Sequence, residues 1–490
     1  MRVADHEERS VKPTFMRRSV ITRNILSRLG AKCAGYVLGF AASILLVRYL
    51  GVERLGQYNY VSTFASLFGL LAGLGLPILL TREAARDKSS AGASLGAALV
   101  LQYGLAALTF LTVAASGALF NPRELVLPIT LLGAGVAVSA LGAPYLALLN
   151  AFEKMHVASA IEVISTLLRV GLILVAIQLR VDVTGLVALL LANPLVVFVL
   201  TKLASDRFCV PPDYTFEGAR LKALLTSTIP FALMVIFNNV YYRVDVVMLE
   251  KMKGDAAVGI YSAAYKLLDV LMVIGANITG VLYPRMAAQA TAAPRALQQT
   301  IERSYRYMTA VGIPASVVIT LLAPWIVRVL FGSDFSDSAP VLRILVLAIP
   351  PMFMYMPLAH ALNATGREWY WIMVLSANTL INIGLNLVLI PTYSFMGAAI
   401  STVFCELMGL VLVALLARRM SDIRYLSALV PVLASSVLLG LPVWYFSDTH
   451  RFTGLTLGAL GYCATLYLVG FFTPEEKLAL RQLFALGSAR

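Results

Sequence analysis

The segment Arg48-Tyr-Leu-Gly-Val-Glu-Arg-Leu-Gly-Gln-Tyr58 contains a Gly-x4-Gly-x-Tyr element, and Lys253-Gly-Asp-Ala-Ala-Val-Gly-Ile-Tyr261 repeats its spacing. The second copy lies 203 residues after the first, counted from Gly51 to Gly254. Each copy follows one long apolar run and precedes another, so it is placed at a turn between two helices. A recurring span-turn-span unit indicates a duplicated membrane protein. We expect the glycines to allow tight turns and close helix approach, and the tyrosines to lie at the membrane interface.

The composition requires a bilayer as solvent. Hydrophobic residues make up 59% of the 490 residues, charged residues 13%, and the mean hydropathy is +0.81. A water-soluble domain this apolar could not cover its own surface. The net charge of +13 arises from cations between the apolar runs, without interleaved aromatic residues, so nucleic-acid binding is not expected. The four cysteines are isolated from each other, which predicts no disulfide framework, metal site or cofactor.

Fourteen apolar runs are long enough to cross a membrane. The first 26 residues are basic and polar, and the run after them is too long for a signal-peptide core, so it is predicted to be a retained anchor. A surface amphipathic helix is predicted over 285–304. The predicted spans are 27–50, 57–80, 92–117, 125–148, 157–179, 183–204, 224–249, 256–280, 305–330, 340–363, 369–390, 396–417, 424–446 and 453–473.

The distribution of cations predicts the orientation. Of the 39 Lys and Arg residues, 25 fall on the side of the amino terminus, eight on the opposite side and six within spans. Because cations are retained on the cytoplasmic side, both termini are predicted to be cytoplasmic, in a multi-pass protein of the cell (inner) membrane. The eight cations on the predicted outer side are Arg54, Arg123, Arg180, Lys251, Lys253, Arg328, Arg343 and Arg451.

Two further pairs of residues extend the duplication. Asn150 and Asn363, each at a turn after a span, are 213 residues apart, and Gly185 and Gly397 are 212 apart. These offsets place spans one to six over spans seven to twelve, so both lobes have the same topology and an axis along the membrane normal relates them. The predicted organisation is a basic amino terminus (1–26), an N-lobe (27–204), a linker (205–222), a C-lobe (223–418), two further helices (419–473) and a cytoplasmic tail (474–490).

Two stretches resemble a known family. The run from Arg48 to Tyr58, followed by Gly75-Leu and Thr81-Arg-Glu-Ala-Ala-Arg, is similar to the opening of Wzx-type polysaccharide-biosynthesis flippases, and Asp245 to Tyr265 is similar to their second lobe. The resemblance covers nearly the whole chain. It implies a transporter of the multidrug/oligosaccharidyl-lipid/polysaccharide (MOP) superfamily. It further implies that the protein moves an undecaprenyl-diphosphate-linked oligosaccharide outward by alternating access, for surface polysaccharide synthesis.

Ionisable residues inside spans are candidates for function because a charge at the bilayer centre costs about 2.5–3.5 kcal/mol. The alternative for Arg28, Lys32 and Arg48 is snorkelling to the headgroups, and the alternative for Lys266 is an ion pair with Asp269. Arg243 cannot face Asp245 from two residues away, so it is predicted to project toward another surface. The Asn ladder in the eleventh span suits sugar hydroxyls or hydrogen bonds between helices. The candidate substrate-binding residues are Arg28, Lys32, Arg48, Arg243, Lys266, Asn378, Asn382 and Asn386.

Four carboxylates inside spans are candidates for coupling to H⁺ or Na⁺: Asp245, Asp269, Glu162 and Glu406. Asp245 lies on one helix face with Asn238 and Tyr242. The alternative for each is an ion pair that fixes helix packing, although Glu406 has no partner on its own helix face.

The chain has no Gly-x4-Gly-Lys-[Ser/Thr] motif for nucleotide phosphates and no long outer loop for a catalytic domain, so it is not expected to be an enzyme. The expected partners are a lipid-linked oligosaccharide, membrane lipids, a coupling ion and other polysaccharide-assembly proteins. The alternatives are a multidrug exporter, a lipid II flippase and a membrane polysaccharide polymerase.

Overall fold

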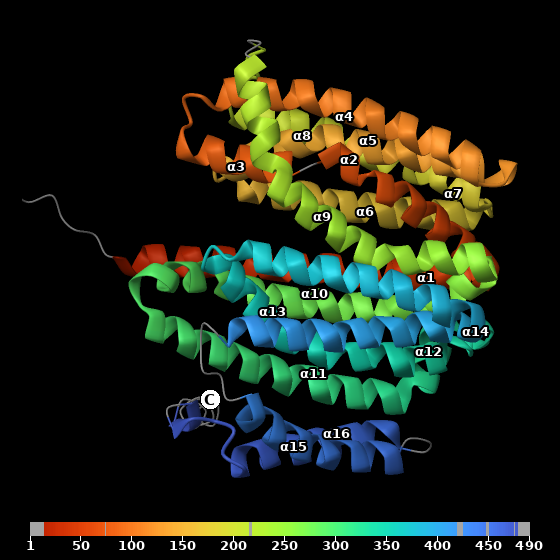
Figure 1. Cartoon of the computed structure of the whole chain (residues 1–490), viewed down its shortest axis with the longest axis vertical. Coiled ribbons are helices and arrows are strands. Elements are labelled where there is room, and N and C mark those ends of the chain that lie inside the picture. Colours follow the sequence, from red (N-terminus) through yellow and green to blue (C-terminus); the bar gives the residue numbers. More distant parts are fainter. Residues whose placement is uncertain are drawn as a thin grey trace, which may run out of the picture. The chain divides into compact units, whose positions relative to one another are not determined.

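A computed structural model of the chain describes the backbone of residues 14–73, 75–214, 218–418, 425–446, 450–474 and 476–478 (Figure 1). Side chains at 14–34, 70, 218–232, 291 and 425–427 lie outside the described part. Within these ranges the regular structure is helical and no strand occurs, which confirms the predicted all-α fold. Ten helices in the described ranges are long and apolar enough to cross a membrane. The number of fourteen spans stays a prediction.

The helices are numbered in chain order. Those up to the predicted linker are α1 (Thr14–Phe68), α2 (Leu70–Gly73), α3 (Leu76–Arg86), α4 (Ala91–Phe120), α5 (Arg123–Ala151), α6 (Met155–Leu179), α7 (Val183–Leu190) and α8 (Ala192–Phe208). Those after it are α9 (Gly218–Lys253), α10 (Asp255–Ala292), α11 (Pro294–Phe331), η1 (Ser333–Phe335), α12 (Ser338–Leu345), η2 (Val346–Ala348), α13 (Ile349–Ala364), α14 (Glu368–Ala417), α15 (Tyr425–Tyr445) and α16 (Arg451–Leu468).

Two pairs of predicted spans are joined through single non-helical residues. α1 passes through Gly51, whose φ of 71° suits glycine because it has no Cβ. α14 passes through Ser394 at φ 52°, three residues after Pro391. The prediction of a separate surface helix over 285–304 is wrong. α10 continues to Ala292 and α11 begins two residues later, with its first position occupied by Pro294, where the missing N–H costs nothing.

The first of two compact units contains residues 1–46, 76–107 and 134–224. Its core joins α3, α4 and α5 through Leu80, Leu95 and Tyr145. α6, α7 and α8 pack against one another (Figure 1). The Asp182 carboxylate caps α7 by accepting a hydrogen bond from the N–H of Gly185 at 2.8 Å.

The second unit contains residues 47–75, 108–133 and 225–490. One core joins α10, α11, α13 and α14 and includes Phe353 and Met352 of α13. α15 and α16 pack against each other, and α15 packs against α11 (Figure 1). The boundaries of the units cross α1, α4, α5 and α9, whereas the predicted lobes change at the linker. The lobe boundaries therefore stay a prediction.

The helices leave large apolar side chains uncovered. Val281 of α10 is 79% exposed and Leu380 of α14 is 68% exposed. Helices satisfy their own backbone hydrogen bonds, so a bilayer can cover such faces at no polar cost. Together with the ten apolar helices, this exposure identifies a multi-pass membrane protein.

Candidate functional site

The two copies of the glycine motif cross each other inside the second unit. A Cβ on Gly56 would lie 1.7 Å from the carbonyl oxygen of Asp255, and a Cβ on Gly259 would lie 1.9 Å from the carbonyl oxygen of Val52. Both distances are far below van der Waals contact, so only hydrogen fits at either position. The second glycine of each copy is therefore required for one close helix crossing, as expected from the sequence.

The tyrosines of the motif are buried, so their predicted location at the membrane interface is wrong. Tyr58 is 7% exposed and Tyr261 is fully buried. A buried phenol needs a hydrogen-bond partner, and the hydroxyl of Tyr261 donates to Oδ2 of Asp245. Tyr261 of the second copy therefore belongs to a buried polar cluster.

That cluster has Asp245 of α9 at its centre. Tyr261 of α10 donates to one carboxylate oxygen, and the N–H of Val246 donates to the other at 2.8 Å. Thr402 of α14 lies 3.4 Å from the Tyr261 hydroxyl. Among the described residues no cation lies within 4.0 Å of Asp245. A buried carboxylate with only neutral donors can take up a proton or a small cation, because either one removes the cost of its charge.

A second buried carboxylate, Glu406, lies on α14, one helical turn after Thr402. The hydroxyls of Tyr241 from α9 and Tyr355 from α13 donate to its two oxygens, each at 2.8 Å. Sequence reasoning found both carboxylates and missed their phenol donors. The sequence contained a partial signal for one donor. Tyr241 precedes Asp245 by four residues, so it shares a helix face with a candidate carboxylate.

The Asn ladder is buried between the two parts of α14. The side-chain amide of Asn378 donates to the carbonyl oxygen of Cys405 at 3.1 Å, and that of Asn382 donates to Oγ of Ser401 at 3.2 Å. Asn386 donates to Oδ1 of Asn382 at 3.0 Å. These contacts match the alternative of hydrogen bonds between helices. The side-chain oxygens Oδ1 of Asn378 and Asn386 accept no hydrogen bond from the described residues.

Arg243, Lys266 and Asp269 form a charged group on α9 and α10. Arg243 and Asp269 are exposed, and Lys266 is half-buried. The Asp269 carboxylate interacts electrostatically with Lys266 and Arg243. Arg243 has no hydrogen bond or ion pair with the described residues.

The remaining predicted site residues are dispersed. Arg48 donates through Nε to the carbonyl oxygen of Leu330 at 2.8 Å and through Nη2 to that of Val329, so it caps the carboxyl end of α11. Glu162 lies exposed on α6 in the first unit, without an ion pair to a described residue. The side chains of Arg28 and Lys32 lie outside the described part.

Sequence reasoning also missed a network beside the glycine crossing. The ammonium of Lys251 donates to Phe120 O and to Asn121 Oδ1, each at 3.1 Å, and lies 5.1 Å from the ring centroid of Tyr60. The Tyr60 hydroxyl donates to the same Asn121 oxygen. These residues come from three separate segments, so no local spacing could reveal the network.

Comparison with known families gives two overlapping matches. The model of the family described as "Polysaccharide biosynthesis protein" matches residues 21–290, which is more than half of the chain. The model of the family described as MatE matches residues 230–388.

Two curated relatives have related descriptions. The chain is 26% identical over 375 residues to the succinoglycan biosynthesis transport protein ExoT of Rhizobium meliloti, covering 73% of each chain. It is 21% identical over 255 residues to the probable low-salt glycan biosynthesis flippase Agl15 of Haloferax volcanii, covering 50% of this chain and 53% of that protein.

Solved structures share the fold. The lipid II flippase MurJ in its inward closed conformation superposes with a TM-score of 0.74 at 13% identity, covering 90% of this chain and 98% of that one. An inward-facing multidrug resistance MATE family transporter of the MOP superfamily gives a TM-score of 0.68 at 17% identity, covering 80% of this chain and 94% of that one. The chain therefore belongs to the polysaccharide biosynthesis protein family and has the fold of the MOP transporter superfamily.

Proposed function

We propose that this protein is a flippase that moves an undecaprenyl-diphosphate-linked oligosaccharide across the cytoplasmic membrane by alternating access. The family match over residues 21–290 is the observation on which the proposal rests. The similarity to ExoT and Agl15, a succinoglycan transport protein and a probable glycan flippase, supports the same cargo class.

The charges support an anionic cargo. Arg243 is exposed on α9 and has no anionic partner within reach of an ion pair among the described residues. Its guanidinium can hold a diphosphate through two parallel hydrogen bonds. Lys266, Arg28 and Lys32 are proposed to add to this field, whereas Arg48 is proposed to contact cargo only when it leaves α11.

The glycine crossing supports alternating access. It joins segments of the two predicted lobes, at the end of the helices that the cation distribution assigns to the outer side. Opening toward that side would separate Gly56 from Gly259 and break the network of Lys251. The cargo headgroup would then pass between the lobes while its polyprenyl chain stays in lipid.

Buried carboxylates are proposed to couple transport to an ion gradient. Asp245 and Glu406 have only neutral donors around them in the described structure, so binding of H⁺ or Na⁺ would change the energy of this arrangement. An ion drives a conformational change only through different affinity for the two states. Asp269 and Glu162 are weaker candidates because both are exposed.

Proteoliposomes provide the test. The full chain would be reconstituted with a fluorescent undecaprenyl-diphosphate-linked oligosaccharide, with lipid II, or with an organic cation, and movement of each across the bilayer would be measured. The proposal predicts fast movement of the first cargo relative to protein-free liposomes. Movement of organic cations alone would indicate a multidrug exporter, and movement of lipid II alone would indicate a lipid II flippase; either result contradicts the proposal.

A further inference from the structure

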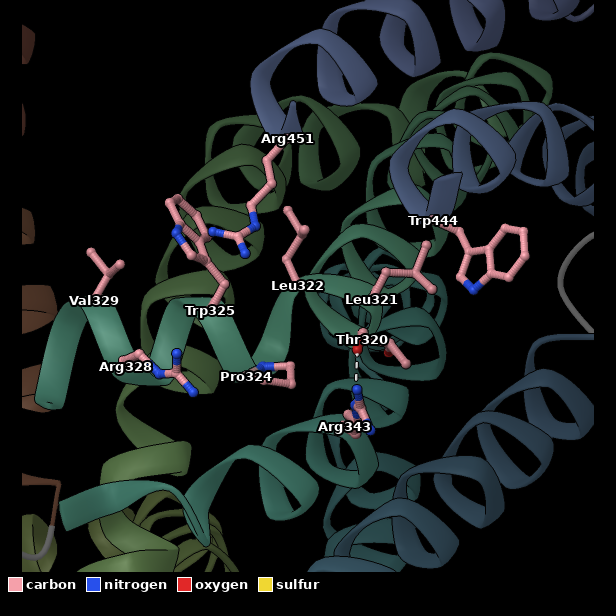
Figure 2. A pocket seen from close by; sticks show the side chains of 10 residues that line it. All are labelled: Thr320, Leu321, Leu322, Pro324, Trp325, Arg328, Val329, Arg343, Trp444 and Arg451. Carbon is pink, nitrogen blue, oxygen red and sulfur yellow. Dashed lines mark hydrogen bonds between the residues drawn. The ribbon is translucent and has the colours of Figure 1, made fainter. Parts of the chain in front are cut away.

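A cavity of about 840 Å³ lies in the second unit, away from the buried carboxylates, between the end of α11, α12, the end of α15 and the start of α16. Figure 2 shows side chains from these four helices around it. Its size lies within the range of sites that hold small organic ligands. The side chains that give it its chemistry are Trp325, Arg328, Arg343, Trp444 and Arg451.

Three arginines give the cavity a positive charge. Arg343 uses Nε to donate to the carbonyl oxygen of Thr320 at 3.2 Å, and its terminal nitrogens make no such contact with the described residues (Figure 2). Arg328 and Arg343 are both exposed, and neither forms an ion pair within the described ranges. Guanidinium groups at such positions bind phosphate oxygens through paired hydrogen bonds.

Two tryptophans add flat apolar surface beside these charges. The guanidinium of Arg451 lies 5.7 Å from the ring centroid of Trp325, which orients it along the wall of the cavity (Figure 2). Trp444 is 65% exposed near the end of α15. Tryptophans at a helix end are typical of the membrane–water interface, where lipid headgroups lie.

The cation distribution makes this cavity unusual. Arg328, Arg343 and Arg451 are three of only eight cations on the predicted outer side of the membrane. Cations are generally kept from that side, so three of them around one cavity indicate a use. An organic cation would be repelled there, and a neutral sugar alone would not require three arginines.

We propose that this cavity binds the phosphate-bearing headgroup of a lipid at the outer membrane interface. The arginines hold the phosphate oxygens, and Trp325 and Trp444 contact the glycerol or sugar next to the phosphate. The lipid is either an ordinary anionic phospholipid or a polyprenyl-diphosphate lipid that has been translocated. Both present the same chemistry to the cavity, and only the second source rests on the proposed function.

Native mass spectrometry of the purified full chain tests the proposal. The probes are phosphatidylglycerol, undecaprenyl diphosphate and, as the zwitterionic reference, phosphatidylcholine. The double substitution R328Q/R343Q is expected to weaken binding of at least one of the first two lipids by about tenfold, with no change for phosphatidylcholine. The matched control R54Q/R123Q removes two exposed cations from the same predicted side outside the cavity and should leave all three affinities unchanged.

The pattern of loss identifies the source of the headgroup. A loss for phosphatidylglycerol assigns the cavity to bulk anionic lipid, and a loss for undecaprenyl diphosphate alone assigns it to translocated cargo. Unchanged binding of both by a folded R328Q/R343Q protein, or an equal loss in the control, would overturn the proposal. Failure of cargo movement in proteoliposomes with this arginine-dependent binding intact would contradict the flippase function and leave the lipid site standing.

Discussion

The two copies of the Gly-x4-Gly-x-Tyr motif have the same backbone role and different chemistry around them. Gly51 and Gly254 both have positive φ, at 71° and 83°, and Gly56 and Gly259 form one crossing together. At the offset of 203 residues, however, Asp245 of the second copy corresponds to Ala42 of the first, and Arg243 corresponds to Phe40. The two copies therefore share the crossing, whereas the positions that correspond to Asp245 and Arg243 are apolar in the first copy.

The shared part of the motif should be the most sensitive to substitution. Gly56→Ala and Gly259→Ala each place a Cβ within 2 Å of a carbonyl oxygen, so we expect each to reduce cargo movement in proteoliposomes by about tenfold or more. Gly280→Ala on α10 is the matched control, because a Cβ there meets nothing within 4 Å. Equal activity of Gly259→Ala and Gly280→Ala would show that the crossing is not needed for transport.

Substitution of Asp245 should distinguish the two copies of the motif, because the first copy has Ala42 at the corresponding position. Asp245→Asn keeps an oxygen that accepts from Tyr261 and removes the titratable charge, so cargo movement should lose its dependence on an ion gradient, with about a tenfold lower rate under that gradient. Initial rates with and without imposed H⁺ and Na⁺ gradients measure this. Ala42→Ser in the first copy is the control. Full gradient dependence in Asp245→Asn would exclude this carboxylate as the coupling site.

The tyrosines of the two copies should differ in how much they contribute to the stability of the fold. Tyr261→Phe removes a donor from a buried carboxylate and should lower the free energy of unfolding by about 1–3 kcal/mol. Tyr58→Phe in the first copy should cost less than about 0.5 kcal/mol, because the Tyr58 hydroxyl has no hydrogen bond to the described residues. Thermal unfolding in detergent compares the two variants, and equal losses would contradict the difference in chemistry.

The smallest effect is expected at the carboxyl end, where the second half has helices that the first half lacks. Arg306 of α11 pairs with Glu476 through one nitrogen and both carboxylate oxygens at 2.7 Å. Burial opposes ionisation of Glu476, but hydrogen bonds from Thr473 and Tyr307 and the charge of Arg306 outweigh it and lower the pKa of Glu476 below its usual 4.5.

The sign of the pH dependence follows from that lowered pKa. The pair should stabilise the fold by about 1 kcal/mol above pH 4.5 and lose this contribution as the pH falls through the folded-state pKa. Melting temperatures measured between neutral pH and about pH 2 should therefore fall less steeply for Glu476→Gln than for the unsubstituted protein. Parallel curves would show that this ion pair does not contribute.

The sequence allowed the fold and both buried carboxylates to be predicted, because each depends on local composition. Asp245 and Glu406 are ionisable groups inside apolar runs, and such residues can be recognised from the linear sequence alone. Their donors Tyr261 and Tyr355 come from other helices. The arginine cavity combines residues 320–343 with residues 444 and 451, so only the packing of α11 against α15 reveals it. The burial of the motif tyrosines was not predicted, because a tyrosine near a helix end can either lie at the membrane interface or donate a hydrogen bond to a buried carboxylate.

The most direct measurement of the central claim is the initial rate at which undecaprenyl-diphosphate-linked oligosaccharide crosses proteoliposomes containing the full chain, Arg243→Ala or Arg243→Lys. If the charged groups of the second copy bind the cargo, the unsubstituted protein moves it, Arg243→Ala slows it by about tenfold, and Arg243→Lys recovers part of the rate. Movement by Arg243→Ala at the rate of the unsubstituted protein, or no movement above protein-free liposomes, would contradict this account.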